Sequence, residues 1–145
     1  MVYFVSDHAG FKLKNRLIQT LRADDIMVED FSPVLDLDDD YPFRGRDLAR
    51  KLALEDSAFG VAICGSGQGI CMALNRFSWI RAGLAREAEE VKLLRQHNRA
   101  NVLCLSGSNT NVELALDLIK VFLETSPSTD ERHIRRVGEL SSLII

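Results

Sequence analysis

The chain has 145 residues, a length that suits one domain with a core large enough to fold without disulfides or a structural metal. Hydrophobic residues make up 46% and charged residues 27%, as in an ordinary globular protein. The formal net charge of −3 leaves no basic footprint, which argues against nucleic acid as the main partner. No apolar run approaches the length of about 18 residues that a membrane span needs, so no membrane association is expected.

Short apolar runs alternate along the chain with segments whose apolar residues recur at helical spacing. Strands are predicted over residues 2–5, 26–31, 59–63, 81–85 and 102–105. Helices are predicted over residues 11–21, around residues 48–55, and over residues 70–76, 87–96, 112–123 and 132–143. An acidic loop, residues 33–40, precedes Tyr41 and Pro42.

This alternation predicts an α/β fold with a parallel sheet, right-handed crossovers and helices on both faces. We expect a three-layer α/β/α Rossmann-like arrangement of about five strands, in a single domain over residues 1–145. Three cysteines, an odd number without a secretory signal, favour reduced thiols and a cytoplasmic protein.

Polar residues follow two of the predicted strands. Asp7 and His8 come after the first strand, and residues 64–69 come after the third. Ligands in such sheets bind at the carboxyl ends of the strands, so neighbouring placement of these strands would join the two clusters. Asp7 could instead cap the following helix. Tyr41 could either reach the binding site at this edge of the sheet or anchor its own loop by packing its ring.

Residues 64–69 read Cys-Gly-Ser-Gly-Gln-Gly, between a buried strand and a helix. Alternate glycines let the backbone turn tightly, so that its N–H groups and the helix N-terminus face one point and form an anion site. Backbone dipoles around Cys64 favour a reactive thiolate. A buried, inert thiol in a glycine-rich turn is the alternative.

Three known kinds of phosphate loop do not fit residues 64–70. A dinucleotide fingerprint would need glycine where Ile70 stands, together with an acid at the end of the next strand. A P-loop would need a lysine, which this loop lacks. A phosphatase loop that begins at cysteine would need arginine at position 70.

Two further polar groups lie late in the sequence. His97 and Asn98 stand between a predicted helix and the last strand, at the amino edge of the sheet. They either cap the helix or serve the site of a neighbouring subunit. Arg132 and Arg136 are four residues apart on one helix face, a spacing that could clamp a phosphate or could simply be a solvated surface.

Five of these stretches together resemble the ribose-5-phosphate isomerase B family and its galactose-6-phosphate isomerase relatives. The matching stretches are residues 6–14 (Ser-Asp-His-Ala-Gly-Phe-Lys-Leu-Lys), 40–42 (Asp-Tyr-Pro), 64–69 and 95–98 (Arg-Gln-His-Asn), and Arg132-His133 with Arg136-Val137. They occur in the order and at the spacing of the family, and they cover nearly the whole chain.

The resemblance implies an aldose–ketose isomerase, without cofactor or metal, that interconverts ribose 5-phosphate and ribulose 5-phosphate through a cis-enediolate. Cys64 would be the base, Ser66 would help proton movement at the oxygens, and His97 of the partner subunit would open the sugar ring. The implied substrate-binding residues are Asp7, His8, Tyr41, Gly65, Gly67, Gln68, Gly69, Asn98, Arg132 and Arg136. Among these, His8 and the two arginines would hold the phosphate.

The chain departs from the family pattern at two positions in the loop. Some members place a catalytic glutamate where Ile70 stands, so the base here must be Cys64. Ser66 replaces a common threonine and keeps the hydroxyl. The family also implies a homodimer, possibly a tetramer, with active sites shared between subunits and the C-terminal helix reaching the partner. A six-carbon substrate such as galactose or allose 6-phosphate, and a non-catalytic sugar-phosphate-binding subunit, remain as alternatives.

Overall fold

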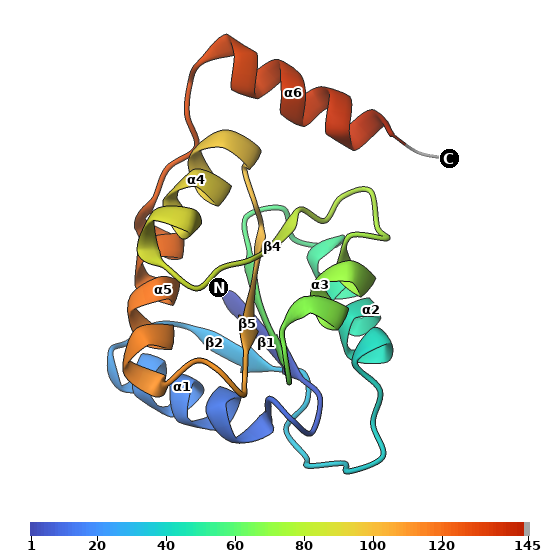
Figure 1. Ribbon diagram of the computed structural model, residues 1–145, viewed down its shortest axis with the longest axis vertical. Helices are drawn as coiled ribbons and strands as arrows, with labels where there is room; N and C mark the ends of the chain where they lie inside the picture. Colours follow the sequence, from blue (N-terminus) through green and yellow to red (C-terminus); the bar gives the residue numbers. More distant parts are fainter. Residues whose placement is uncertain (144–145) are drawn as a thin grey trace.

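The computed structural model describes residues 1–143, so the last two residues of the predicted domain lie outside it. Five strands form one sheet in the order β2-β1-β3-β5-β4, and every neighbouring pair is parallel (Figure 1). The strands are β1 (Val2–Ser6), β2 (Val28–Asp30), β3 (Phe59–Cys64), β4 (Ala82–Leu84) and β5 (Val102–Ser106). The helices are α1 (Phe11–Ala23), α2 (Tyr41–Leu52), α3 (Gln68–Leu74), α4 (Ala88–Asn98), α5 (Val112–Glu124) and α6 (Glu131–Ser142).

Helices cover both faces of this sheet, as the alternation of elements predicts. Helices α1, α4 and α5 pack on one face against side chains such as Phe4 and Leu105. Helices α2 and α3 pack on the other face, against Val5 and Cys104. Because both faces are buried, the central strands are continuous apolar runs rather than alternating ones. The predicted α/β three-layer fold is confirmed.

Several element boundaries differ from the expected ones, and the differences at β2, α2 and α4 are the most informative. Strand β2 is shorter than predicted because it is an edge strand that pairs only through residues 28–30 with β1. Helix α2 begins at Tyr41, with Pro42 in its first turn, where the fixed φ of proline suits a helix start. His97 and Asn98 are the last two residues of α4 rather than a loop after it.

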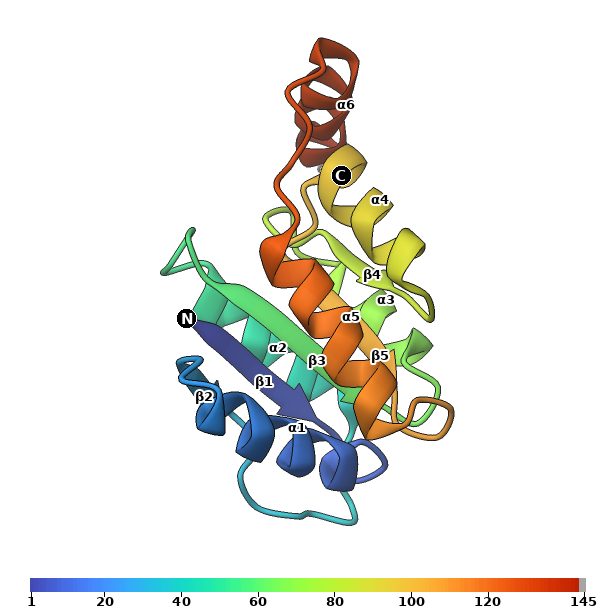
Figure 2. The ribbon, with the colours of Figure 1, turned by 90° about the vertical axis from the view of Figure 1, so that its left-hand side faces the viewer.

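Helix α6 extends beyond the end of α4 and contacts that helix through His133 (Figure 2). Its one buried residue is His133, and its other side chains are exposed or half-buried. An extended segment, residues 125–130, leads to it from α5. Within residues 1–143, every helix is too short or too polar to cross a membrane.

Candidate active site

The site begins where β1 and β3 end side by side. Ser6 of β1 lies opposite Ile63 of β3, so Asp7 and Cys64 emerge at the same edge of the sheet. The predicted meeting of these two clusters is confirmed. Strand β5 lies on the other side of β3, with Ser106 opposite Cys64, and adds a third loop to this edge.

Cys64 is the last residue of β3 and its side chain lies on the α2–α3 face of the sheet. The residue is only 4% exposed and carries a free thiol. A thiol in this position is sheltered from bulk water but stands at the start of the glycine loop. The reactive thiolate expected there stays a prediction.

Gly67 and Gly69 are required by the geometry of the loop, whereas a Cβ on Gly65 would make only ordinary contacts. Gly67 has a φ of 79°, which side chains rarely adopt, and a Cβ there would lie 2.8 Å from the carbonyl oxygen of Leu105. A Cβ on Gly69 would lie 2.7 Å from the Cζ atom of Tyr41. The ring of Tyr41 therefore packs directly on the loop, and it is 40% exposed at the mouth. Tyr41 thus both anchors and borders the site.

The loop offers backbone donors that the protein leaves free. Within residues 1–143, the N–H groups of Gly65, Ser66 and Gly67 donate no hydrogen bond. The Ser66 hydroxyl accepts a hydrogen bond from the Gln68 amide at 3.3 Å, which closes the turn. Adjacent free N–H groups form a concave site suited to a negatively charged oxygen. Residues 65–67 are called the amide cradle below.

Asp7 borders the cradle and also organises the start of α1. Its Oδ1 atom accepts a hydrogen bond from the amide of Gly10, the residue before α1, at 3.1 Å. Burial raises the pKa of Asp7 above its usual range, although this hydrogen bond opposes the shift. Asp7 thus holds the turn that precedes α1, whereas the N-cap residue Gly10 brings no side-chain cap, so the capping role considered from the sequence is not found.

His8 is held by a carboxylate that sequence reasoning missed. The backbone N–H and the Nδ1 atom of His8 lie 2.8 and 3.0 Å from Oδ1 of Asp39. Arg44 donates from Nε to the other oxygen of Asp39 at 2.9 Å. The hydrogen bond to Asp39 raises the pKa of His8, so its positive charge persists to a higher pH. The side chain of His8 is 43% exposed and free to meet an anion.

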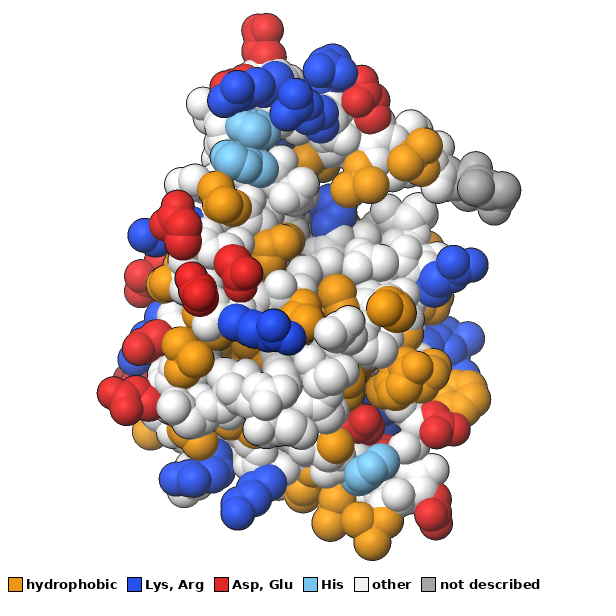
Figure 3. Space-filling model, viewed as in Figure 1, with side chains coloured by type: hydrophobic (Ala, Val, Ile, Leu, Met, Phe, Trp, Pro, Cys, Tyr) orange, Lys and Arg blue, Asp and Glu red, His pale blue; other side chains and the backbone are white. Residues whose placement is uncertain are grey.

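The remaining predicted residues gather at the opposite edge of the sheet. His97 and Asn98 end α4, just before the start of β5, while Arg132 and Arg136 lie on α6. The rings of His97 and His133 stack with their centroids 4.1 Å apart and 7° between their planes. In Figure 3 the arginine side chains of α6 lie above this pair of histidines.

Burial lowers the pKa of His133, and the nearby His97 and Arg132 lower it further. A hollow of about 470 Å³ opens beside the stacked rings. It is lined in part by Gln96, Ser128, Asp130 and Arg132. Within one subunit, this group is separated from Cys64 by the length of β5, which is roughly 13 Å at about 3.3 Å per residue.

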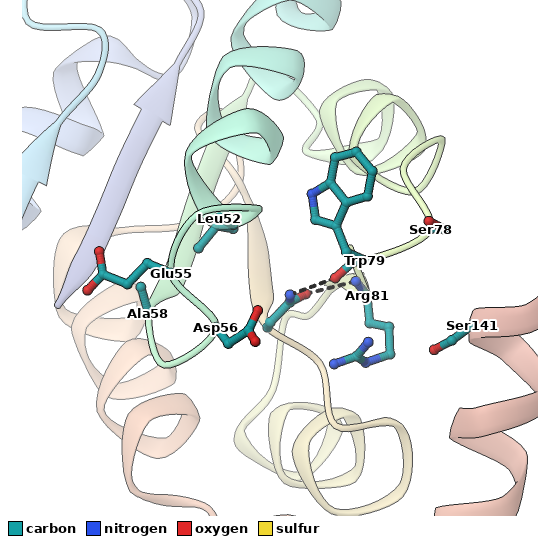
Figure 4. Close-up of a pocket in the computed structure, with 9 residues that line it drawn as sticks. Leu52, Glu55, Asp56, Ala58, Ser78, Trp79, Arg81 and Ser141 are labelled. Carbon is teal, nitrogen blue, oxygen red and sulfur yellow. Dashed lines mark hydrogen bonds between the residues drawn. The ribbon is translucent and has the colours of Figure 1, made fainter.

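Another hollow, of about 400 Å³, lies at this same amino edge (Figure 4). It lies between the turn after α2 and residues 78–81, with Ser141 of α6 across from it. Trp79 and Asn101 there are engaged in structural hydrogen bonds, Trp79 to the Ala49 carbonyl at 2.8 Å and Asn101 to the Trp79 carbonyl at 2.9 Å. This hollow contains none of the predicted site residues. In residues 1–143, no three His, Cys, Asp or Glu side chains are placed together as metal ligands.

A family model described as Ribose/Galactose Isomerase matches residues 2–140. The probable ribose-5-phosphate isomerase B of Mycoplasma pneumoniae is 37% identical over 140 residues, which are 96% of this chain and 91% of that protein. The ribose-5-phosphate isomerase B of Escherichia coli is 32% identical over 142 residues, 98% of this chain and 95% of that protein.

Solved structures agree with these sequence matches. The ribose 5-phosphate isomerase of Thermotoga maritima superimposes with a TM-score of 0.91 at 34% identity, covering 97% of this chain and 96% of that one. Ribose-5-phosphate isomerase B of Mycoplasma genitalium, solved with bound ribulose-5-phosphate, gives 0.89 at 32% identity, with 97% and 93% covered.

Proposed function

The chain belongs to the Ribose/Galactose Isomerase family, and from that premise we propose that it interconverts ribose 5-phosphate and ribulose 5-phosphate with Cys64 as the base. The observation that carries this assignment is the buried Cys64 thiol at the start of a cradle of free backbone N–H groups. The ribulose-5-phosphate bound to the relative from M. genitalium supports a five-carbon substrate over a six-carbon one.

The proton transfer follows from this geometry. The Cys64 thiolate removes the proton from C2 of the open-chain aldose and returns it to C1, through a cis-enediolate. Negative charge develops on the substrate oxygen during this step, and preoriented N–H groups of the amide cradle stabilise it there. The hydroxyl of Ser66 helps to exchange the proton between the two oxygens. Because Cys64 is buried, few waters compete for the transferred proton.

Groups at both edges of the sheet serve the rest of the substrate. His8, whose pKa is raised by its hydrogen bond to Asp39, contacts the phosphate of a sugar bound at Cys64 of the same subunit. His97 opens the sugar ring, with Asn98 beside it, and the arginines of α6 clamp the phosphate. Because these residues lie a strand length from Cys64, they act in the pocket of a second subunit.

We therefore place the protein in a homodimer in which α6 reaches over the partner. Support comes from α6 itself, which buries only His133 and leaves the apolar Ile134 and Leu140 exposed at 42% and 49%. The presence of both Cys64 and His97 argues against a non-catalytic binding subunit. The three free cysteines support a reducing compartment, the cytoplasm.

Replacing the proposed base tests the function directly. Cys64→Ala should lower kcat for ribose 5-phosphate by about 10²–10⁴, the usual worth of a general base, with KM largely kept. Iodoacetamide should inactivate the wild type unless substrate protects it. Cys71→Ala, which removes a half-buried thiol that donates to the Ala82 carbonyl at 3.5 Å, is the matched control and should keep its activity. Near-normal turnover in Cys64→Ala would reject the thiol as base.

A further inference from the structure

The turn after β5 is bonded to the backbone of the glycine loop. The Gly107 N–H donates to the Cys64 carbonyl at 2.8 Å, and the Ser108 N–H donates to the Gly65 carbonyl at 3.1 Å. The Ser106 hydroxyl also donates to the Gly65 carbonyl, at 2.8 Å. The Gly65 carbonyl therefore accepts two hydrogen bonds from a segment about 40 residues later in the chain.

The hydroxyl of Ser106 has a defined direction. Ser106 is 1% exposed and lies opposite Cys64 in the sheet. Its Oγ atom accepts hydrogen bonds from both the backbone N–H and the side-chain amide of Asn109, each at 3.2 Å. These two donors occupy the lone pairs of the oxygen, so its single hydrogen is committed to Gly65.

Holding these carbonyls also orients the amide cradle. In a trans peptide the N–H of one residue points opposite to the C=O of the residue before it, and no peptide bond in residues 1–143 is cis. With the Gly65 carbonyl held toward the turn after β5, the N–H of Ser66 points away from it, and it donates no hydrogen bond within residues 1–143. Glycine itself is permissive in φ and ψ, so the orientation at Gly65 depends on these outside partners.

We infer that Ser106 is a positioning residue for the isomerase reaction, which holds the Gly65 carbonyl so that the Ser66 N–H faces the enediolate oxygen. The inference rests on the proposed function of the cradle. Ser106 does not touch the substrate, and it acts only through the peptide between Gly65 and Ser66. Its loss should weaken stabilisation of the enediolate and leave substrate binding unchanged.

The test is Ser106→Ala, measured by kcat, KM and the affinity for a hydroxamate analogue of the enediolate. We expect kcat to fall by about 10- to 100-fold, less than the 10²–10³ that loss of a whole oxyanion donor costs. Affinity for the hydroxamate should fall by a similar factor, while KM and inhibition by inorganic phosphate stay at wild-type values. Ser106→Thr, which keeps the hydroxyl, should recover most of the activity.

Ser32→Ala provides the matched control for loss of a buried serine hydroxyl. Ser32 is 2% exposed and its Oγ accepts a hydrogen bond at 2.8 Å from the backbone N–H of Ser6 in β1, not from the glycine loop. This variant should lose a similar amount of thermal stability and keep its kcat.

The inference would be overturned if Ser106→Ala kept the wild-type kcat, or if its kcat fell without a matching fall in hydroxamate affinity. The proposed function would still stand in either case, provided that the wild type is active. An inactive wild type would overturn both.

Discussion

Mixing two inactive variants tests whether two subunits build each active site. Cys64 lies opposite Ser106 at the end of β5, whereas His97 lies in α4 before β5 begins. The rise along β5 is roughly 13 Å at about 3.3 Å per residue. An imidazole must come within about 2.6–3.2 Å of the atom it protonates or deprotonates. We therefore expect His97 to act on a sugar bound at Cys64 of a second subunit and not of its own.

The expected recovery follows from counting sites. If each site is shared as proposed, Cys64→Ala removes one of its essential residues and His97→Asn removes the other. If equal amounts pair at random, about half of the dimers are mixed, and each mixed dimer has one site with both residues intact. Activity should therefore approach about one quarter of the wild-type value. The two chains can be co-expressed or exchanged by mild denaturation, and ribulose 5-phosphate formation is then measured.

The control mixes two variants that both lack the Cys64 thiol. Cys64→Ala mixed with Cys64→Ser should recover no activity, since every site then lacks the thiol. If the first pair also stays inactive after subunit exchange has been verified, His97 acts in its own subunit's site or outside catalysis, and the strand-length reasoning is wrong.

Two further predictions concern the phosphate. Arg132→Ala and Arg136→Ala should each raise KM with little change in kcat, because each loses about 1.5–3 kcal/mol of binding free energy with one hydrogen bond between charged groups. Wild-type KM values in both variants would show that the two arginines are only a solvated surface. Because Asp39 raises the pKa of His8, phosphate affinity should fall as the pH rises through that raised pKa and His8 loses its charge. Asp39→Asn lowers the pKa of His8 and should move the rise in KM to lower pH, and an unchanged KM profile would contradict this role.

Much of this arrangement could be predicted from local patterns. The alternation of apolar runs and helical spacing predicts the layers, and chain direction places Asp7 and Cys64 at one edge and His97 at the other. The ends of the helices and strands are harder to predict from the sequence, because the length of an edge strand such as β2 is set by its neighbour and not by its own residues.

The contacts that support the site residues cannot be predicted from local sequence patterns. Asp39 looks like one of several acids in a loop, yet it fixes His8, and the contact joins residues 31 positions apart. Ser106 reads as the polar end of a buried strand, and only the tertiary structure places its hydroxyl on Gly65. The stack of His97 on His133 likewise depends on how α6 meets α4.

The strand order has a consequence for synthesis of the chain. Strand β4 pairs with β5 alone at the sheet edge, and β5 is inserted between β3 and β4 although it is made after both. Until β5 leaves the ribosome, the apolar β3 keeps an open edge, which can template aggregation. Translating residues 85–106 takes roughly one to four seconds at about 5–20 residues per second. A translational pause before β5 has left the ribosome would prolong this stage and increase the need for a chaperone.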